Sequence, residues 1–160
     1  MWVSIAGVVA VALYATWAAV QILVLNPLAA VPGVPLHGIH ATMTAQRQWQ
    51  GEGPVLAILG LGVLLAAGVA VFAIAQRVHP VVPAMSFLVL LLFGAPAYFI
   101  ASFGPGMGLA DTYMIGGGDA SPWALPLYAI SIASGILLII GALVVARRER
   151  AAATVASVTN

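Results

Sequence analysis

Four long apolar stretches determine the predicted architecture of this chain. They run approximately over residues 2–25, 54–75, 82–103 and 123–146, and none of them contains a charged side chain. A helix rises about 1.5 Å per residue, so roughly 20 residues cross the hydrocarbon core of a bilayer. A strand in a membrane barrel needs only about 10 residues, and a helix satisfies its own backbone hydrogen bonds in lipid. The pattern therefore predicts an all-α membrane protein, a bundle of four transmembrane helices.

The first connection, residues 26–53, opens with a stretch punctuated by Pro27, Pro32 and Pro35, which favours turns over helix. A short helix is predicted from Leu36 to Gln50, with apolar residues on one side and polar residues on the other. Such a segment suits the membrane surface, where Trp49 would act as an anchor. We therefore expect a short interfacial helix in the first outer loop.

Glycine dominates the third connection, residues 104–122, which contains GPGMG and GGGD. Glycine permits tight turns and gives little intrinsic order, so we expect a flexible loop here. The small residues 151–160 are expected to form a flexible cytoplasmic tail. Residues 1–150 are then a single four-helix transmembrane domain.

The arginines predict the orientation. Arg77 lies in the short second connection, and Arg147, Arg148 and Arg150 follow the last apolar stretch. Cytoplasmic loops carry an excess of basic residues, so both termini should be cytoplasmic, with Arg47 the exception on the outside. The first stretch has no basic segment before it and is long for a signal peptide, so we expect it to be retained. The predicted location is a bacterial inner (plasma) membrane.

Composition supports a membrane protein and excludes several classes. The chain is 63% hydrophobic and 6% charged, with a mean hydropathy of +1.13, whereas soluble domains are roughly a quarter charged. It has no cysteine, which excludes disulfides and thiolate metal sites. A net charge of +1 gives no basis for nucleic-acid binding. Arginine without lysine, together with abundant Ala, Gly and Val, is typical of a GC-rich, actinobacteria-like coding sequence.

His37 and His40 are the candidate metal ligands. Their spacing of three places both imidazoles on one helix face, and Met43, Asp111 or Asp119 would have to complete a zinc or copper site from the same side of the membrane. Without a third fixed ligand, the alternative that both histidines are interfacial residues is favoured. The two aspartates are expected to hold the outer loops together with Arg47 rather than to act in catalysis.

Several residues within the predicted spans are expected to shape the helices or their packing. Pro96, beside Gly94, should kink or loosen the third helix, either at a binding site or simply in packing. A semi-polar stripe on the first helix faces either the other helices or a partner subunit or quinone-like ligand. The stripe consists of Tyr14, Trp17 and Gln21. The small-residue pairs predicted to bring helices together are Gly62 with Ala66 and Ser131 with Gly135.

Function is predicted mainly by exclusion. No ionisable residue lies within a predicted span, which disfavours a proton relay, and no histidine is placed there for haem. The common phosphate-binding, zinc-protease and serine-hydrolase motifs are absent from the sequence. We therefore expect no catalysis and no cofactor. The chain is expected to be an accessory or structural subunit of an inner-membrane complex, in contact with lipid and with partner membrane proteins or further copies of itself. The alternative is a self-contained transporter or binder of an apolar or metal ligand that uses the outer loops.

Overall fold

Every regular element in the part of the chain that the structure describes is helical. The computed structural model describes the backbone of residues 1–158 and the side chains of residues 1–148. Within it, four helical segments are long and apolar enough to cross a membrane, as the sequence predicts. These segments are Trp2–Ala30, Gly53–Ala75, Val81–Tyr113 and Pro122–Arg148.

The first segment is one continuous rod with a change of winding near its end. It consists of α1 (Trp2–Val20), a π-helical turn η1 (Gln21–Leu25) and α2 (Asn26–Ala30). The prediction of turns from Asn26 onward is therefore wrong for the first five residues. Pro27 has no N–H to donate to the preceding turn of this continuous rod, and the π-helical turn lies directly before α2, where the hydrogen-bond pattern changes. The rod ends at Val31, before Pro32 and Pro35.

The third segment is broken in the middle and is longer than predicted. It consists of α5 (Val81–Leu92) and α6 (Gly94–Tyr113), which meet at Phe93. Pro96 lies three residues after this break. The expected glycine-rich loop is wrong for residues 104–113, which are helical and include Pro105. The remaining connection starts at Met114, whose left-handed backbone (φ 56°) ends α6.

Close packing explains why glycines are helical here. A Cβ at Gly108 would collide with the backbone carbonyl oxygen of Gln48, and one at Gly106 would lie 3.0 Å from the carbonyl oxygen of Gly117. These two glycines thus let α6 approach the chain segments on either side of it. Their low helix propensity is outweighed by this tertiary contact.

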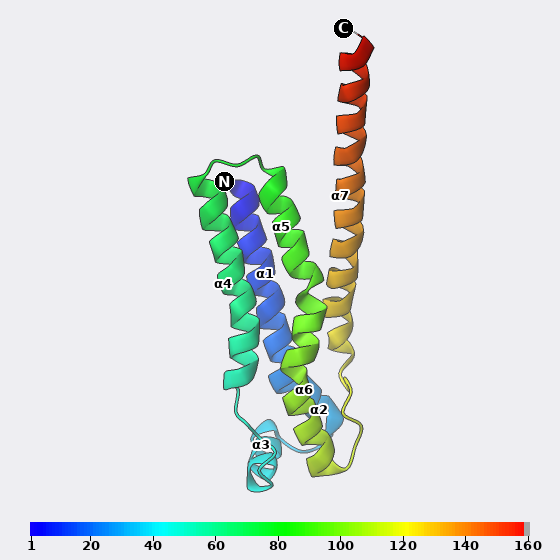
Figure 1. Cartoon of the computed structure of the whole chain (residues 1–160). Helices are drawn as coiled ribbons and strands as arrows, with labels where there is room; N and C mark the ends of the chain where they lie inside the picture. The colour runs from blue at the N-terminus through cyan, green and yellow to red at the C-terminus, as the bar shows by residue number, and fades with distance from the viewer. Residues whose placement is uncertain (159–160) are drawn as a thin grey trace.

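The remaining helices complete a bundle with one long member. Helix α4 spans Gly53–Ala75 and packs mainly on α1, while α7 (Leu125–Val158), entered through the 3-10 turn η2 (Pro122–Ala124), packs mainly on α5. Figure 1 shows α7 extending well past the ends of α1, α4 and α5. The backbone of residues 151–158, expected to be a flexible tail, continues this helix. Residues 159 and 160 of that tail lie outside the described residues.

A second layer closes the end of the bundle opposite the N-terminus. Helix α3 (Leu36–Ala45) lies there beside the last turns of α6 (Figure 1). Ile39 and Met43 of α3 are buried against Leu109 of α6, with Trp49 and Tyr113 at the edge of this cluster. The short helix predicted from Leu36 to Gln50 is present but ends at Ala45, so the prediction is wrong for residues 46–50; its apolar side packs against α6. We call this region, residues 26–52 and 104–121, the α3 end of the bundle.

Candidate functional site

The semi-polar stripe of the first rod faces the start of α7. Tyr14 Oη donates to the carbonyl oxygen of Leu127 (3.3 Å) and Trp17 Nε1 donates to that of Trp123 (3.0 Å). Gln21 Nε2 donates to the carbonyl oxygen of Ser121 (3.4 Å). The donors follow one another along the first rod in the opposite order to their acceptors near α7, so the stripe joins two antiparallel segments of the chain. The donors of the stripe are therefore used inside the chain, whereas Gln21 Oε1 is buried without a hydrogen-bond partner.

A serine on α7 forms hydrogen bonds with the two backbone groups that are separated at the break between α5 and α6. The Ala95 N–H donates to Ser131 Oγ (3.0 Å), and Ser131 Oγ donates to the carbonyl oxygen of Leu91 (2.8 Å). In an unbroken helix, Ala95 would donate to Leu91 directly. Ser131 and Gly135 thus lie where α7 meets the broken rod, and a Cβ at Gly135 would lie 3.1 Å from Leu92 Cδ1.

Asp119 binds two tyrosines rather than an arginine or a metal site. Tyr98 Oη donates to its Oδ1 (2.5 Å) and Tyr128 Oη donates to its Oδ2 (2.8 Å). The two rings also pack edge to face, with centroids 5.7 Å apart. Asp119 therefore fixes the connection after α6 to both α6 and α7. Asp111 lies exposed in the last turns of α6, apart from this arrangement.

Asn26 holds the same connection from the first rod. Its Oδ1 accepts hydrogen bonds from the backbone N–H groups of Ala120 (2.8 Å) and Ser121 (3.3 Å). Together with the Gln21 bond to Ser121, it anchors the chain just before η2. Sequence reasoning missed this role because the partners are about a hundred positions apart.

The proposed metal ligands are not gathered at one point. His40 stacks on Trp49 with ring centroids 4.2 Å apart, whereas His37 is exposed. Met43 is buried in the core with Ile39 and Leu109. Within residues 1–148, no three His, Asp or Glu side chains lie close enough together to hold a metal ion. The geometry therefore gives the histidine pair no third ligand from these residue types.

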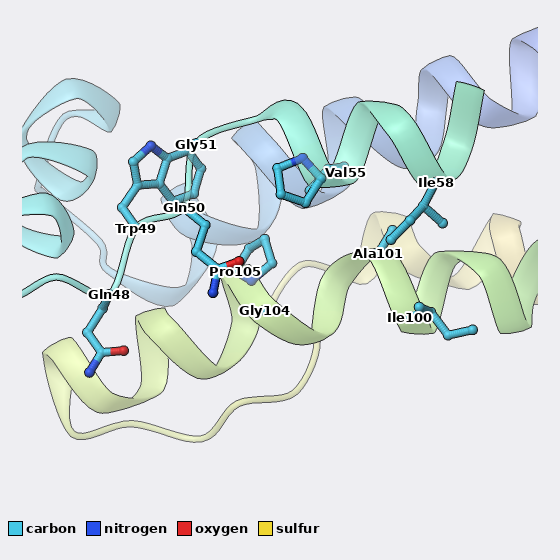
Figure 2. A pocket seen from close by; sticks show the side chains of 11 residues that line it. Gln48, Trp49, Gln50, Gly51, Val55, Ile58, Ile100, Ala101, Gly104 and Pro105 are labelled. Atoms are coloured by element: carbon cyan, nitrogen blue, oxygen red, sulfur yellow. The ribbon is translucent and has the colours of Figure 1, made fainter. Parts of the chain in front are cut away.

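A small cavity lies where the α3 end meets the bundle. Its volume is about 140 Å³, and it is bounded by residues 48–51, the first turns of α4 and the middle of α6. Figure 2 shows Gln48, Trp49 and Gln50 on one side, Val55 and Ile58 on α4, and Ala101, Gly104 and Pro105 on α6. This cavity could not be predicted from the sequence, because its walls come from three separate segments, one of which was in part predicted to be a loop.

A second cavity of about 210 Å³ lies next to the first, between α1, α4 and the two parts of the broken rod. Ile58 and Ile100 line both cavities, so we treat the two together as the α4/α6 groove. The second cavity is almost entirely apolar and includes Tyr14 and Gly94 in its wall. Gly62 also lines it, with no heavy atom near the position of an added Cβ, whereas Ala66 is fully buried. Of the predicted packing pair, only Ala66 is packed against other helices, whereas Gly62 lies at the open surface of the cavity.

The polar side chains described above hold the helices together, and the α4/α6 groove has no charged side chain in its lining. No nucleophile with an adjacent base is found at either cavity, and Tyr14 is the only ionisable side chain among the groove's lining residues. Such a surface suits binding rather than acid or base chemistry. Comparison of the chain with protein-family models, curated proteins and solved structures gave no match.

Proposed function

We propose that this chain is a multi-pass protein of a bacterial inner membrane and serves as a non-catalytic subunit of a membrane complex. The observation that carries this proposal is the position of α7. It packs along one side on α5 and extends beyond the other helices (Figure 1). The remaining side of its apolar part is left for lipid or for another protein.

The two sides of α7 differ in character. The side toward the bundle carries Leu127, Ser131 and Ser134, all nearly inaccessible to solvent. The opposite side carries a row of large apolar residues at alternating spacings of four and three, the pattern of a helix-packing seam. The members of this row are Ile132, Ile136, Ile139 and Leu143, each more than half exposed. We name this row the α7 outer row.

The charges support cytoplasmic termini. Arg77 follows the end of α4 that lies away from α3, and Arg147 and Arg148 lie in the part of α7 away from α3. Four other charged residues belong to the α3 end: Arg47, Glu52, Asp111 and Asp119. The basic bias of cytoplasmic segments then favours the α3 end as the outer one. In this orientation, the extension of α7 enters the cytoplasm, where a partner subunit can contact it.

Photocrosslinking in the native host tests the subunit role. A photoreactive amino acid is placed at Ile136 or Ile139 in the α7 outer row, and the matched control carries it at Leu64, an exposed residue of α4. We expect one defined heterologous membrane protein to be captured from α7 and not from Leu64. Adducts that contain only this chain, or the same adducts from both helices, would contradict the proposal.

A self-contained binder of an apolar ligand is the second candidate, and the α4/α6 groove favours it. Binding of a metal ion by the outer loops has less support, because His40 stacks on Trp49 and Met43 is buried in the core. The two candidates are compatible, since the groove is lined by α1, α4, α5 and α6 whereas the α7 outer row is on another helix.

A further inference from the structure

The α4/α6 groove has one polar end and one apolar end. It follows α4 from Pro54 in the first cavity to Leu65 in the second. At about 1.5 Å per residue, this stretch of helix is roughly 16 Å long. A groove that runs along a transmembrane helix for this distance matches an extended molecule better than a compact one.

The polar end offers both donors and acceptors of hydrogen bonds. Gln48 and Gln50 line it, and Figure 2 shows the amide of Gln50 directed toward Gly104 and Pro105, whereas the side chain of Gln48 points away from them. Pro105 has no N–H, so the carbonyl oxygen of Ala101 lacks its usual helical donor four residues later. Ala101 is itself nearly inaccessible and lines the same cavity.

The apolar end is hollowed by small residues. Gly62 and Ala97 line it, and a Cβ at Gly62 would meet no heavy atom, whereas the space beside Gly94 is filled by the Tyr14 ring. The wall is otherwise built from residues such as Leu65 and Leu91. The break at Phe93 lies beside this end, since Phe93 and Gly94 are both lining residues. Only an apolar chain is stabilised in such surroundings.

We propose that the α4/α6 groove binds a neutral single-chain amphiphile, with its head at Gln50 and its tail along Gly62 and Ala97. The head must be uncharged, because no charged side chain lines either cavity and a buried unpaired charge is costly. It should carry a hydroxyl or amide, which both donates and accepts as the polar end requires.

The first test compares two probes of equal chain length on the purified protein in nanodiscs. One probe is a monoacylglycerol with a photoreactive group in its tail, and the other is the corresponding fatty acid at a pH at which it is ionised. We expect the neutral probe to crosslink at least about tenfold more efficiently, with adducts near Gly62 and Leu65. Equal labelling by the anion, or adducts spread over all lipid-exposed helices, would overturn the proposal. This test needs no variant and does not depend on the subunit role.

The second test fills the groove. Gly62→Leu places a side chain in the apolar end, and Gly60→Leu is the matched control, because Gly60 also lies on α4 in open space but lines neither cavity. We expect Gly62→Leu to weaken binding of the neutral probe by about tenfold and Gly60→Leu to change it by less than about twofold. Equal effects of the two substitutions would contradict the assigned tail position.

The head position is tested with Gln50→Leu, for which Gln46→Leu is the control, since Gln46 lies outside the lining. Loss of a hydrogen bond at the head should reduce the preference for monoacylglycerol over an alkane probe of equal length, by about tenfold. An unchanged preference in Gln50→Leu would contradict the assigned head position.

Discussion

Ser131 Oγ on α7 accepts the hydrogen bond that the Ala95 N–H would donate to Leu91 in an unbroken helix. The same hydroxyl donates to Leu91, so one side chain satisfies both backbone groups at the break. Tyr14 Oη lies 3.3 Å from it as well. Three helical segments therefore meet at one hydroxyl, and the broken rod depends on α7 for its geometry.

Removal of this hydroxyl should destabilise the fold. Ser131→Ala leaves the Ala95 N–H and the Leu91 carbonyl without this partner, and we expect a loss of about 1–3 kcal/mol in the free energy of unfolding. Thermal or denaturant unfolding in mild detergent measures this loss. Ser134→Ala is the control, because Ser134 Oγ donates only to Ile130 in its own helix. Equal losses in the two variants would contradict the bridging role of Ser131.

Asp119 should be energetically coupled to the tyrosines that it binds. A double-mutant cycle of Asp119→Asn with Tyr128→Phe should give a coupling energy of about 0.5–3 kcal/mol, since the two groups share one hydrogen bond. The unfolding free energies of the four proteins supply this value. The pair Asp111→Asn with Tyr128→Phe is expected to be additive. Additivity in the Asp119 cycle would show that the bond to Tyr128 contributes nothing to stability.

Gly108 should control the attachment of the α3 end. Gly108→Ala forces a Cβ against the carbonyl oxygen of Gln48. This oxygen belongs to the backbone and alanine has no alternative rotamer, so a side-chain rotation cannot relieve the contact. We expect faster amide hydrogen exchange in residues 36–50, because local opening of this layer becomes easier. Gly118→Ala, at a position with open space, is the matched control. Unchanged exchange in Gly108→Ala would mean that α3 is not held by this close approach.

His40 should act through its contact with Trp49. His40→Phe keeps an aromatic ring for stacking, whereas His40→Ala removes it, so only the alanine variant should lose stability, by about 0.5–1.5 kcal/mol. Titration with Zn²⁺ and Cu²⁺ provides the complementary measurement. If both variants lose stability equally, and the wild type alone binds metal tightly, then the imidazole is a ligand and the stacking role is secondary.

The elements that were predictable from sequence are those fixed by local pattern. Four apolar stretches without charge indicated the four long helices, and the spacing of Leu36, Ile39 and Met43 indicated a short helix in the first connection. Residues 104–113 were mispredicted because the tertiary approach of Gly106 and Gly108 outweighs their weak helix propensity.

The candidate site was less predictable because its contacts join distant segments. Tyr14, Trp17 and Gln21 were recognisable as one stripe, yet their acceptors are backbone carbonyls about a hundred positions away, which no side-chain pattern reveals. The α4/α6 groove likewise needs the packed positions of α1, α4 and α6. Pro105 was the one local sign, and the loop prediction obscured its effect on the Ala101 carbonyl.

Cysteine labelling tests the proposed orientation, in which the helices cross the membrane with the α3 end outside. The chain has no cysteine, so Gly116→Cys at the α3 end and Gln76→Cys at the opposite end can each carry the only thiol. An impermeant thiol reagent is applied to intact spheroplasts and then to permeabilised ones. We predict labelling of Gly116→Cys in both samples and of Gln76→Cys only after permeabilisation. Labelling of both variants in intact spheroplasts, or the reverse pattern, would contradict the account.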